Sequence, residues 1–272
     1  MNTGIHEISF DDYLKIDAMS ATALKALSHS YLSYTALADK PETTSMAFGT
    51  LAHTAVLEPE VLDRAVITPE YRINEKGKEV KFVRAGKHWD EFKAANAEND
   101  IFSKADYESA MLLSKTVNAN PDAKASLIGR HELSLVWNDP KFGLSKCRFD
   151  VINDFFGADL KTCQRIDDRG FSSACAAYRY DIQAAWYMRG AKACGYDLKE
   201  FRFIAVEPSI PHDNAVYIAT DMMIQSGVKG MKEAFETLKE GPNMSWTGAH
   251  QGISFIDMPE YFYAESDQEV VL

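Results

Sequence analysis

The sequence KCRFDVINDFFGADLKT, residues 146–162, contains two apolar-rich runs separated by the short turn FFG. This pattern predicts two adjacent β-strands. Because side chains alternate along a strand, Asp159 and Lys161 are expected to share one face. If Asp150 on the neighbouring strand points the same way, two carboxylates and one ammonium group meet on one small patch.

Two carboxylates about 4 Å apart repel each other by about 4 kcal/mol at an effective dielectric near 20. A cation or a proton must relieve this repulsion. Oxygen ligands in an open site favour Mg²⁺, for which Mn²⁺ can substitute. The pattern therefore predicts a metal-dependent hydrolase. The alternative is a solvated face or a surface ion pair, but the neighbours Phe149, Val151 and Leu160 indicate buried strands, where charges need partners.

The remaining periodicity predicts an α/β protein. With 272 residues, 46% of them hydrophobic, the chain can bury a full core. We expect one domain over residues 1–272, in which residues 1–125 are mainly helical and residues 126–272 form an α/β core whose first strands make an antiparallel meander. Helices are expected at residues 21–37, 46–60, 90–100, 103–120, 171–195 and 221–241, and strands at residues 131–138, 144–154, 157–162, 201–208 and 215–220.

The composition and the absence of certain sequence patterns indicate where the protein is located and which metal sites it lacks. No apolar run of about 18 residues occurs and the N-terminus lacks a signal pattern, so we expect a soluble, cytoplasmic protein without membrane contact. The four cysteines are too widely spaced for an iron–sulfur cluster or a CxxC metal site and are expected to be reduced. They are Cys147, Cys163, Cys175 and Cys194.

Basic residues are concentrated in one polar segment of an acidic chain whose net charge is −11. Residues 72–87 carry six basic and two acidic side chains, a balance of +4, so the remainder sums to −15. This segment is either a solvated loop or a mobile basic arm over a polyanion such as DNA. The side chains expected to bind DNA are Lys76, Lys78, Lys81 and Arg84.

Two further pairs have helical spacing. Gly49 and His53 are four residues apart on one face, where glycine would allow another backbone to approach closely. Gln183 and Tyr187 are also four apart. Without further evidence His53 could be a hydrogen-bonded core histidine, and Gln183 with Tyr187 could form a half-buried polar edge.

Taken together, these residues resemble the PD-(D/E)xK nuclease superfamily, in the branch of the RecB nuclease domain and the RecE-type phage exonucleases. Its ordered pattern GxxxH, D, DxK and QxxxY occurs here as GTLAH (49–53), CRFD ending at Asp150, ADLK (158–161) and QAAWY (183–187). MSATALKALSHS (19–30) and FIAVEPSIP (203–211) are also RecE-like, so the resemblance covers roughly residues 13–260. One departure is Phe149, where the superfamily name expects proline.

The resemblance implies a PD-(D/E)xK nuclease core, a central mixed β-sheet flanked by helices, with a helical N-terminal region. It further implies a metal site and roles for several side chains. Lys161, whose pKa a cation would lower, would orient or deprotonate the attacking water. Gln183 and Tyr187 would position the site or the DNA backbone, and Glu132 could approach the metal as an outer ligand. The implied ligands of Mg²⁺ or Mn²⁺ are His53, Asp150, Asp159 and the carbonyl of Leu160.

The expected function is that of a Mg²⁺-dependent exonuclease that digests double-stranded DNA from 5′ to 3′, leaving 3′ single strands for recombination by strand annealing. The resemblance implies a phage or prophage origin in bacteria, a ring-shaped homo-oligomer (a tetramer or a trimer) and a single-strand annealing protein as partner. Three alternatives stay open. They are an endonuclease or single-strand nuclease of the same fold, a DNA-binding module with an inactive site, and a structural ion-pair cluster in a metabolic enzyme.

Overall fold

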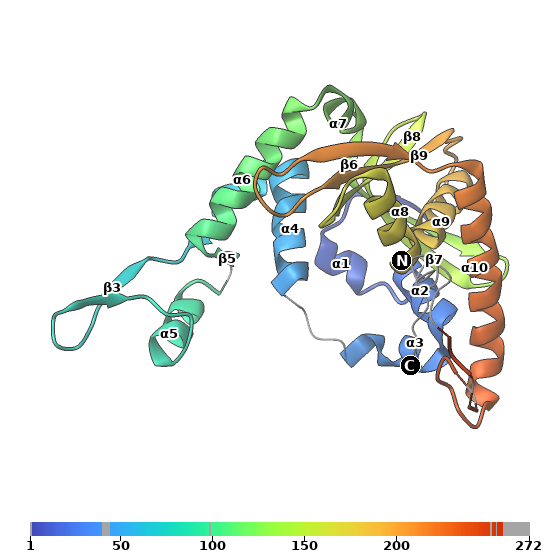
Figure 1. Cartoon of the computed structure of the whole chain (residues 1–272), viewed down its shortest axis with the longest axis horizontal. Helices are drawn as coiled ribbons and strands as arrows, with labels where there is room; N and C mark the ends of the chain where they lie inside the picture. Colours follow the sequence, from blue (N-terminus) through green and yellow to red (C-terminus); the bar gives the residue numbers. More distant parts are fainter. Residues whose placement is uncertain (1, 40–43, 98, 251, 254, 258–272) are drawn as a thin grey trace, which may run out of the picture.

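A six-stranded mixed sheet organises the protein (Figure 1). The computed structural model describes residues 2–39, 44–97, 99–250, 252–253 and 255–257. The sheet has the order β1-β6-β7-β8-β9-β10. Its strands are β1 (Gly4–His6), β6 (Arg130–Asp139), β7 (Gly143–Ile152), β8 (Phe156–Thr162), β9 (Glu200–Val206) and β10 (Asn214–Ile218).

The predicted meander is confirmed, because β6, β7 and β8 pair antiparallel in chain order. Strand β9 then pairs parallel with β8, and β10 pairs antiparallel with β9, which makes the sheet mixed as expected. The sequence analysis did not foresee β1, which adds to the edge at β6 with Ile5 opposite Leu135.

Helices cover both faces of the sheet (Figure 1). They are α1 (Phe10–Leu14), α2 (Ala21–His29), α3 (Tyr31–Thr35), α4 (Thr44–Leu57), α5 (Lys87–Ala95), α6 (Lys104–Ala119), α7 (Pro121–Ser126), α8 (Asp168–Ala177), α9 (Tyr180–Ala193) and α10 (Asp221–Glu240), with short 3₁₀ turns at Ala36–Asp39, Pro59–Arg64 and Gly241–Asn243.

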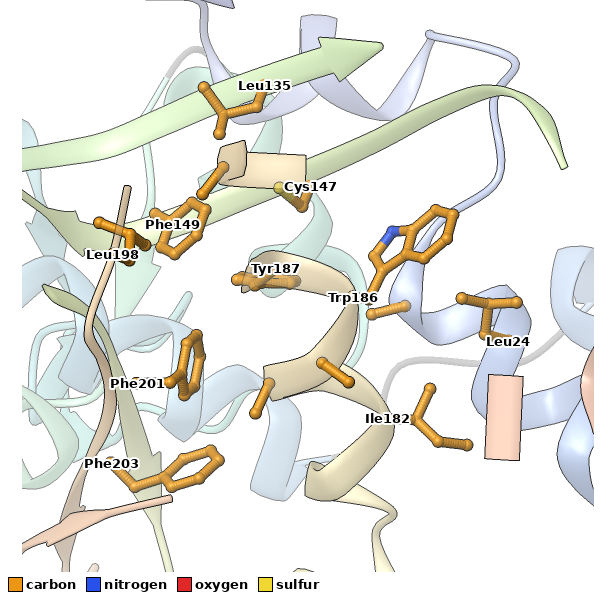
Figure 2. Close-up of a cluster of buried hydrophobic side chains, with 14 of the residues drawn as sticks. Leu24, Leu135, Cys147, Phe149, Ile182, Trp186, Tyr187, Leu198, Phe201 and Phe203 are labelled. Atoms are coloured by element: carbon orange, nitrogen blue, oxygen red, sulfur yellow. The ribbon is translucent and has the colours of Figure 1, made fainter. Parts of the chain in front are cut away.

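Two apolar clusters join these layers. On one face, α4 and α6 pack against β8 and β9, with Leu160, Ile204 and Val206 buried between them. On the other face, α9 lies between the sheet and the helices α2 and α10, and Figure 2 shows Phe201 and Phe203 facing the α9 helix. Strand β8 is therefore enclosed on both sides, so its polar side chains are held in a largely water-excluded setting.

Two helices expected to be continuous are broken. The segment expected at residues 171–195 forms α8 and α9, and Arg179 between them has a left-handed backbone with φ 50°. The segment expected at 21–37 divides into α2 and α3 at Ser30, whose hydroxyl accepts the N–H of Ser33 as an N-cap. The apolar periodicity continues across both breaks, so periodicity alone did not reveal them.

Helix α10 packs closely against the break before α9. A Cβ atom at Gly227 would lie 2.0 Å from the carbonyl oxygen of Asp181, and one at Gly230 would lie 2.2 Å from the Nη2 atom of Arg179. Only glycine allows α10 to approach the first turn of α9 this closely. Arg179 in turn forms an ion pair with Asp181, with Nε 3.0 Å from Oδ1.

The predicted basic loop, residues 72–87 and here called the basic arm, belongs to a folded segment formed by residues 66–97 and 99–102. This segment contains the antiparallel pair β3 (Tyr71–Ile73) and β4 (Glu79–Lys81), the parallel pair β2 (Val66–Ile67) and β5 (Ile101–Phe102), and α5. Figure 1 shows β3 and α5 extending away from the sheet and its helices. Packing of Phe82 against Trp89 and Phe92 holds α5 on the hairpin.

Two further expectations concern cysteines and membranes. All four cysteines are free thiols, in agreement with the sequence analysis. Among the described residues, no helix combines the length and apolar character needed to cross a membrane.

Candidate metal centre

The centre begins where two strands of the meander separate. Strands β7 and β8 pair at Val151 with Ala158 and at Ile152 with Gly157 and then diverge. The carboxylate of Asp150 enters this fork, and its Oδ2 atom accepts the backbone N–H of Leu160 at 2.7 Å. A buried backbone N–H without a strand partner needs another acceptor, so the divergence itself fixes the position of Asp150.

Helix α4 brings His53 to the same fork. Its Nδ1 atom lies 3.3 Å from Oδ2 of Asp150. Burial is the main cause that lowers the pKa of His53, which favours the neutral imidazole that a metal ligand requires. Gly49, one turn earlier, is not needed for close approach, because a Cβ there would make only an ordinary contact of 3.8 Å with Thr162.

Glu132 of β6 completes a possible ligand group. Ligand atoms of His53, Glu132 and Asp150 all lie within 4.8 Å of one another. Arg148 orients Glu132 through an ion pair in which Nε lies 2.6 Å from Oε2. The sequence analysis expected Glu132 only as an outer ligand of the metal. The fold places its carboxylate within 4.8 Å of the ligand atoms of both His53 and Asp150.

Asp159 and Lys161 form the second half of the centre. The Nζ atom of Lys161 lies 2.5 Å from Oδ2 of Asp159, and the amide of Gln183 donates to Oδ1 of Asp159, also at 2.5 Å. The Asp159 side chain is only 3% exposed. Its Oδ2 atom has no aligned hydrogen bond among the described residues, so it depends on a nearby positive charge.

The ionisation of the centre shows how strongly its charges interact. Burial raises the pKa of Asp150 well above its usual value, and the negative charges of Asp159 and Glu132 raise it further. Burial acts to lower the pKa of Lys161, but the charges of Asp159, Tyr180 and Asp150 outweigh it, and the net shift is upward. Without a cation beside it, Lys161 therefore carries its proton.

The residues present fit a divalent cation. Glu132, Asp150 and Asp159 offer carboxylate oxygens, which Mg²⁺ and Mn²⁺ prefer, and His53 adds an imidazole nitrogen. The raised pKa of Asp150, to which the charges of Asp159 and Glu132 contribute, indicates negative charge that a bound cation would relieve. The Leu160 backbone, expected as a ligand through its carbonyl, lies in the same fork and hydrogen-bonds His53.

Sequence reasoning missed a second lysine. Lys25 of α2 donates from Nζ to Oε1 of Gln183 at 2.7 Å. The ammonium groups of Lys25 and Lys161 each lie 5.0 Å from the ring centre of Tyr180. Burial, followed by the charge of Lys161, lowers the pKa of Lys25 to about 7. Lys25 lies within MSATALKALSHS, but nothing local indicates which residues it contacts.

Gln183 and Tyr187 have different surroundings despite their helical spacing. Gln183 bridges Lys25 and Asp159. Tyr187 lies in the core, with ring centres 4.9 Å from Phe149 and 5.8 Å from Phe201 (Figure 2). Burial raises the pKa of Tyr187 well above its usual value. Tyr187 is 9% exposed and packs against these two rings, and its expected role in positioning the site or the DNA backbone stays a prediction.

The four side chains expected to bind DNA do not join the centre. They are exposed on the basic arm, where Arg84 also lies over the ring of Trp89 at 5.4 Å. Their role in DNA binding stays a prediction.

The chain is similar to known proteins in sequence and in fold. The family model described as "PDDEXK-like domain of unknown function (DUF3799)" matches residues 10–249. The crystal structure of a "putative exonuclease" from Eubacterium rectale has a TM-score of 0.61 at 13% sequence identity, covering 97% of this chain and 100% of that one. No curated protein matches the chain. The mixed sheet with flanking helices is thus the fold expected from the sequence.

Proposed function

Because the chain belongs to the family of PDDEXK-like domains whose model spans residues 10–249, we propose that it is a metal-dependent nuclease. More narrowly, we propose a Mg²⁺-dependent, RecE-type exonuclease that digests double-stranded DNA from 5′ to 3′ and leaves 3′ single strands for strand annealing. The observation that carries the proposal is the position of the His53, Glu132 and Asp150 ligand atoms beside the Asp159–Lys161 pair.

The chemistry of the centre suits phosphodiester hydrolysis. When bound, a divalent cation supplies Lewis acidity toward a phosphate oxygen and lowers the pKa of a coordinated water. His53, Glu132, Asp150 and Asp159 would hold it. Lys161 would orient or deprotonate the attacking water and, when charged, would offset the negative charge that develops on phosphorus-bound oxygens.

Hydrogen bonds fix these groups before substrate arrives. Gln183 holds one oxygen of Asp159 while Lys161 holds the other, so the carboxylate cannot rotate freely. Arg148 similarly holds Glu132. Preorganised groups of this kind avoid rearrangement during the reaction, which is how active sites stabilise developing charge efficiently.

The charge distribution favours a polyanionic duplex as substrate. The basic arm presents Lys76, Lys78 and Lys81 to solvent, while the rest of the chain is acidic. The sequence contains no GxxxxGK[ST] motif for ATP-driven movement, so processivity would have to come from topology. A ring of four or three subunits around DNA would supply it, and the 3′ strand would pass to an annealing protein.

End-labelled substrates test the proposal. With Mg²⁺, a linear duplex labelled at its 5′ end should release labelled nucleotide at once, whereas a 3′ label should appear late and a closed circular duplex should stay intact. Cleavage of the circle would favour an endonuclease, and preference for denatured DNA a single-strand nuclease. If the chain binds DNA in a salt-dependent way but does not hydrolyse it at any Mg²⁺ or Mn²⁺ concentration, it is a DNA-binding module with an inactive site.

A further inference from the structure

Beyond the metal centre, a pocket of about 660 Å³ opens between α8 and the helices α4 and α6. Its wall includes Thr162, the residue after Lys161 in β8, and Phe48, beside Gly49 in α4. The pocket is therefore adjacent to the catalytic strand and to the helix that carries His53. Tyr178, the last residue before the break between α8 and α9, also lines the pocket.

Tyr178 is the outer member of a stack of aromatic rings. Its ring centre lies 5.8 Å from that of Tyr180 at an interplanar angle of 26°, and Tyr180 lies 5.7 Å from Phe203 at 26°. Phe203 is buried, whereas Tyr178 is 64% exposed. Tyr180 thus supports the Tyr178 ring from one side, while most of the Tyr178 side chain stays open to solvent.

This stack leads directly to the catalytic lysine. The Nζ atom of Lys161 lies 5.0 Å from the ring centre of Tyr180. The left-handed residue Arg179, against which α10 packs, separates Tyr178 from Tyr180 at the helix break. Tyr178 therefore presents an exposed ring one aromatic ring away from the ammonium of Lys161.

We propose that Tyr178 is a stacking platform for a nucleobase of the DNA strand near the cleaved bond, and that the adjacent pocket receives this base. Every base presents a flat π-face that can stack on an aromatic ring. The edges of a base carry hydrogen-bonding groups, for which Gln164 and Thr162 on the pocket wall are suitable partners. The platform would favour an unpaired base, because stacking on Tyr178 replaces stacking within the duplex. This inference rests on the proposed nuclease function and specifies the substrate at that site.

Fluorescence of a 2-aminopurine oligonucleotide tests the platform without requiring catalysis. The probe carries the base analogue near the 5′ end and binds the wild-type chain in EDTA or with Ca²⁺. Stacking should quench its fluorescence. Tyr178→Ala should abolish the quenching and weaken binding of single-stranded ends by about five-fold to about a hundred-fold, whereas Tyr178→Phe should behave like wild type.

A matched control is Phe155→Ala, which removes another exposed aromatic ring, 51% exposed, at the turn between β7 and β8. It should leave quenching and affinity unchanged. Retained quenching in a folded Tyr178→Ala variant would overturn the platform, while DNA digestion by the wild type would still support the nuclease. Quenching that depends on Tyr178 in a protein that never hydrolyses DNA would instead overturn the nuclease alone. Failure of the wild type to bind or quench the probe would overturn the platform as well.

Discussion

Glu132 and Asp150 interrupt the pairing of β6 with β7, and the backbone of Glu132 is left-handed with φ 52°. The ladder is regular on either side, where His131 pairs with Val151 and Leu133 with Phe149. A residue other than glycine in this conformation costs of order 1–3 kcal/mol and persists where the surroundings demand it. Here the conformation coincides with the carboxylate that faces His53 and Asp150.

We therefore predict that Glu132→Gln weakens Mn²⁺ binding by about ten-fold or more, because a charged ligand becomes neutral. His53→Ala should likewise raise the metal concentration that activity requires. Isothermal titration with Mn²⁺ in the absence of DNA measures the first effect. Glu233→Gln on α10, an exposed acid, serves as control. If Glu132→Gln binds Mn²⁺ as tightly as the wild type, Glu132 is not a metal ligand. If His53→Ala needs no more metal for activity than the wild type, His53 is a hydrogen-bonded core residue.

Hydrolysis should be lost in each of the variants Asp150→Ala, Asp159→Ala and Lys161→Ala, with folding largely intact. Removing Asp150, whose pKa burial and the neighbouring carboxylates raise, should even stabilise the metal-free protein slightly. Nucleotide release at saturating Mg²⁺ and thermal unfolding measure the two effects. Asp154→Asn, an exposed acid in the turn of the same hairpin, should keep full activity. Near wild-type activity in any of the three variants would contradict the assigned site.

Lys25 should make stability depend on pH in a defined direction. Its pKa is lowered from 10.5 to about 7 in the folded protein, so between these values the unfolded chain binds the proton more tightly. The contribution of Lys25 to stability therefore rises with pH across this window. Lys25→Met should gain stability over the wild type most clearly below pH 7, and this gain should shrink as the pH rises.

Urea unfolding at about pH 6 and about pH 9 measures this difference. Lys232→Met, which removes an exposed lysine from α10, should show the same small difference from wild type at both values. A Lys25→Met gain that is equal at the two pH values would mean that burial does not control the charge of Lys25.

Neutralising Lys76, Lys78 and Lys81 together should weaken duplex binding and flatten its salt dependence. Each lost phosphate contact reduces the slope of log affinity against log salt by roughly 0.9. The cleavage rate on saturating DNA should change little, because the basic arm contributes no ligand to the metal centre. Fluorescence anisotropy over a series of salt concentrations measures the slope. An unaltered slope would make the arm a solvated surface with no part in binding.

Assembly follows from the same charge distribution. A 30.4 kDa acidic subunit with one basic arm has little surface to retain a duplex alone, whereas a closed ring brings several arms around one channel. Light scattering without DNA should report about three or four times the subunit mass. A strict monomer that digests long duplexes without releasing them would contradict the ring but leave the metal chemistry intact.

Local patterns were sufficient to predict much of the fold. Alternating apolar residues predicted the meander from β6 to β8, and 3.6-residue periodicity predicted α4, α6 and α10. The motif spacing also selected Asp150, Asp159, Lys161, His53 and Gln183, which the structure brings into one neighbourhood. These features are encoded within short windows, because strand and helix periods depend on neighbouring residues alone.

Other features required the tertiary structure. The fork that holds Asp150 arises because β7 and β8 stop pairing, and the contact between Lys25 and Gln183 joins residues 158 positions apart. Gln183 and Tyr187 are both buried on α9, and only its packing against the sheet gives Gln183 the partner Asp159 and Tyr187 the partner Phe149. The sequence by itself determined which chemical groups are present and which strand or helix carries them. Their final partners depended on where strands diverge and helices pack, since such contacts form only when distant segments meet.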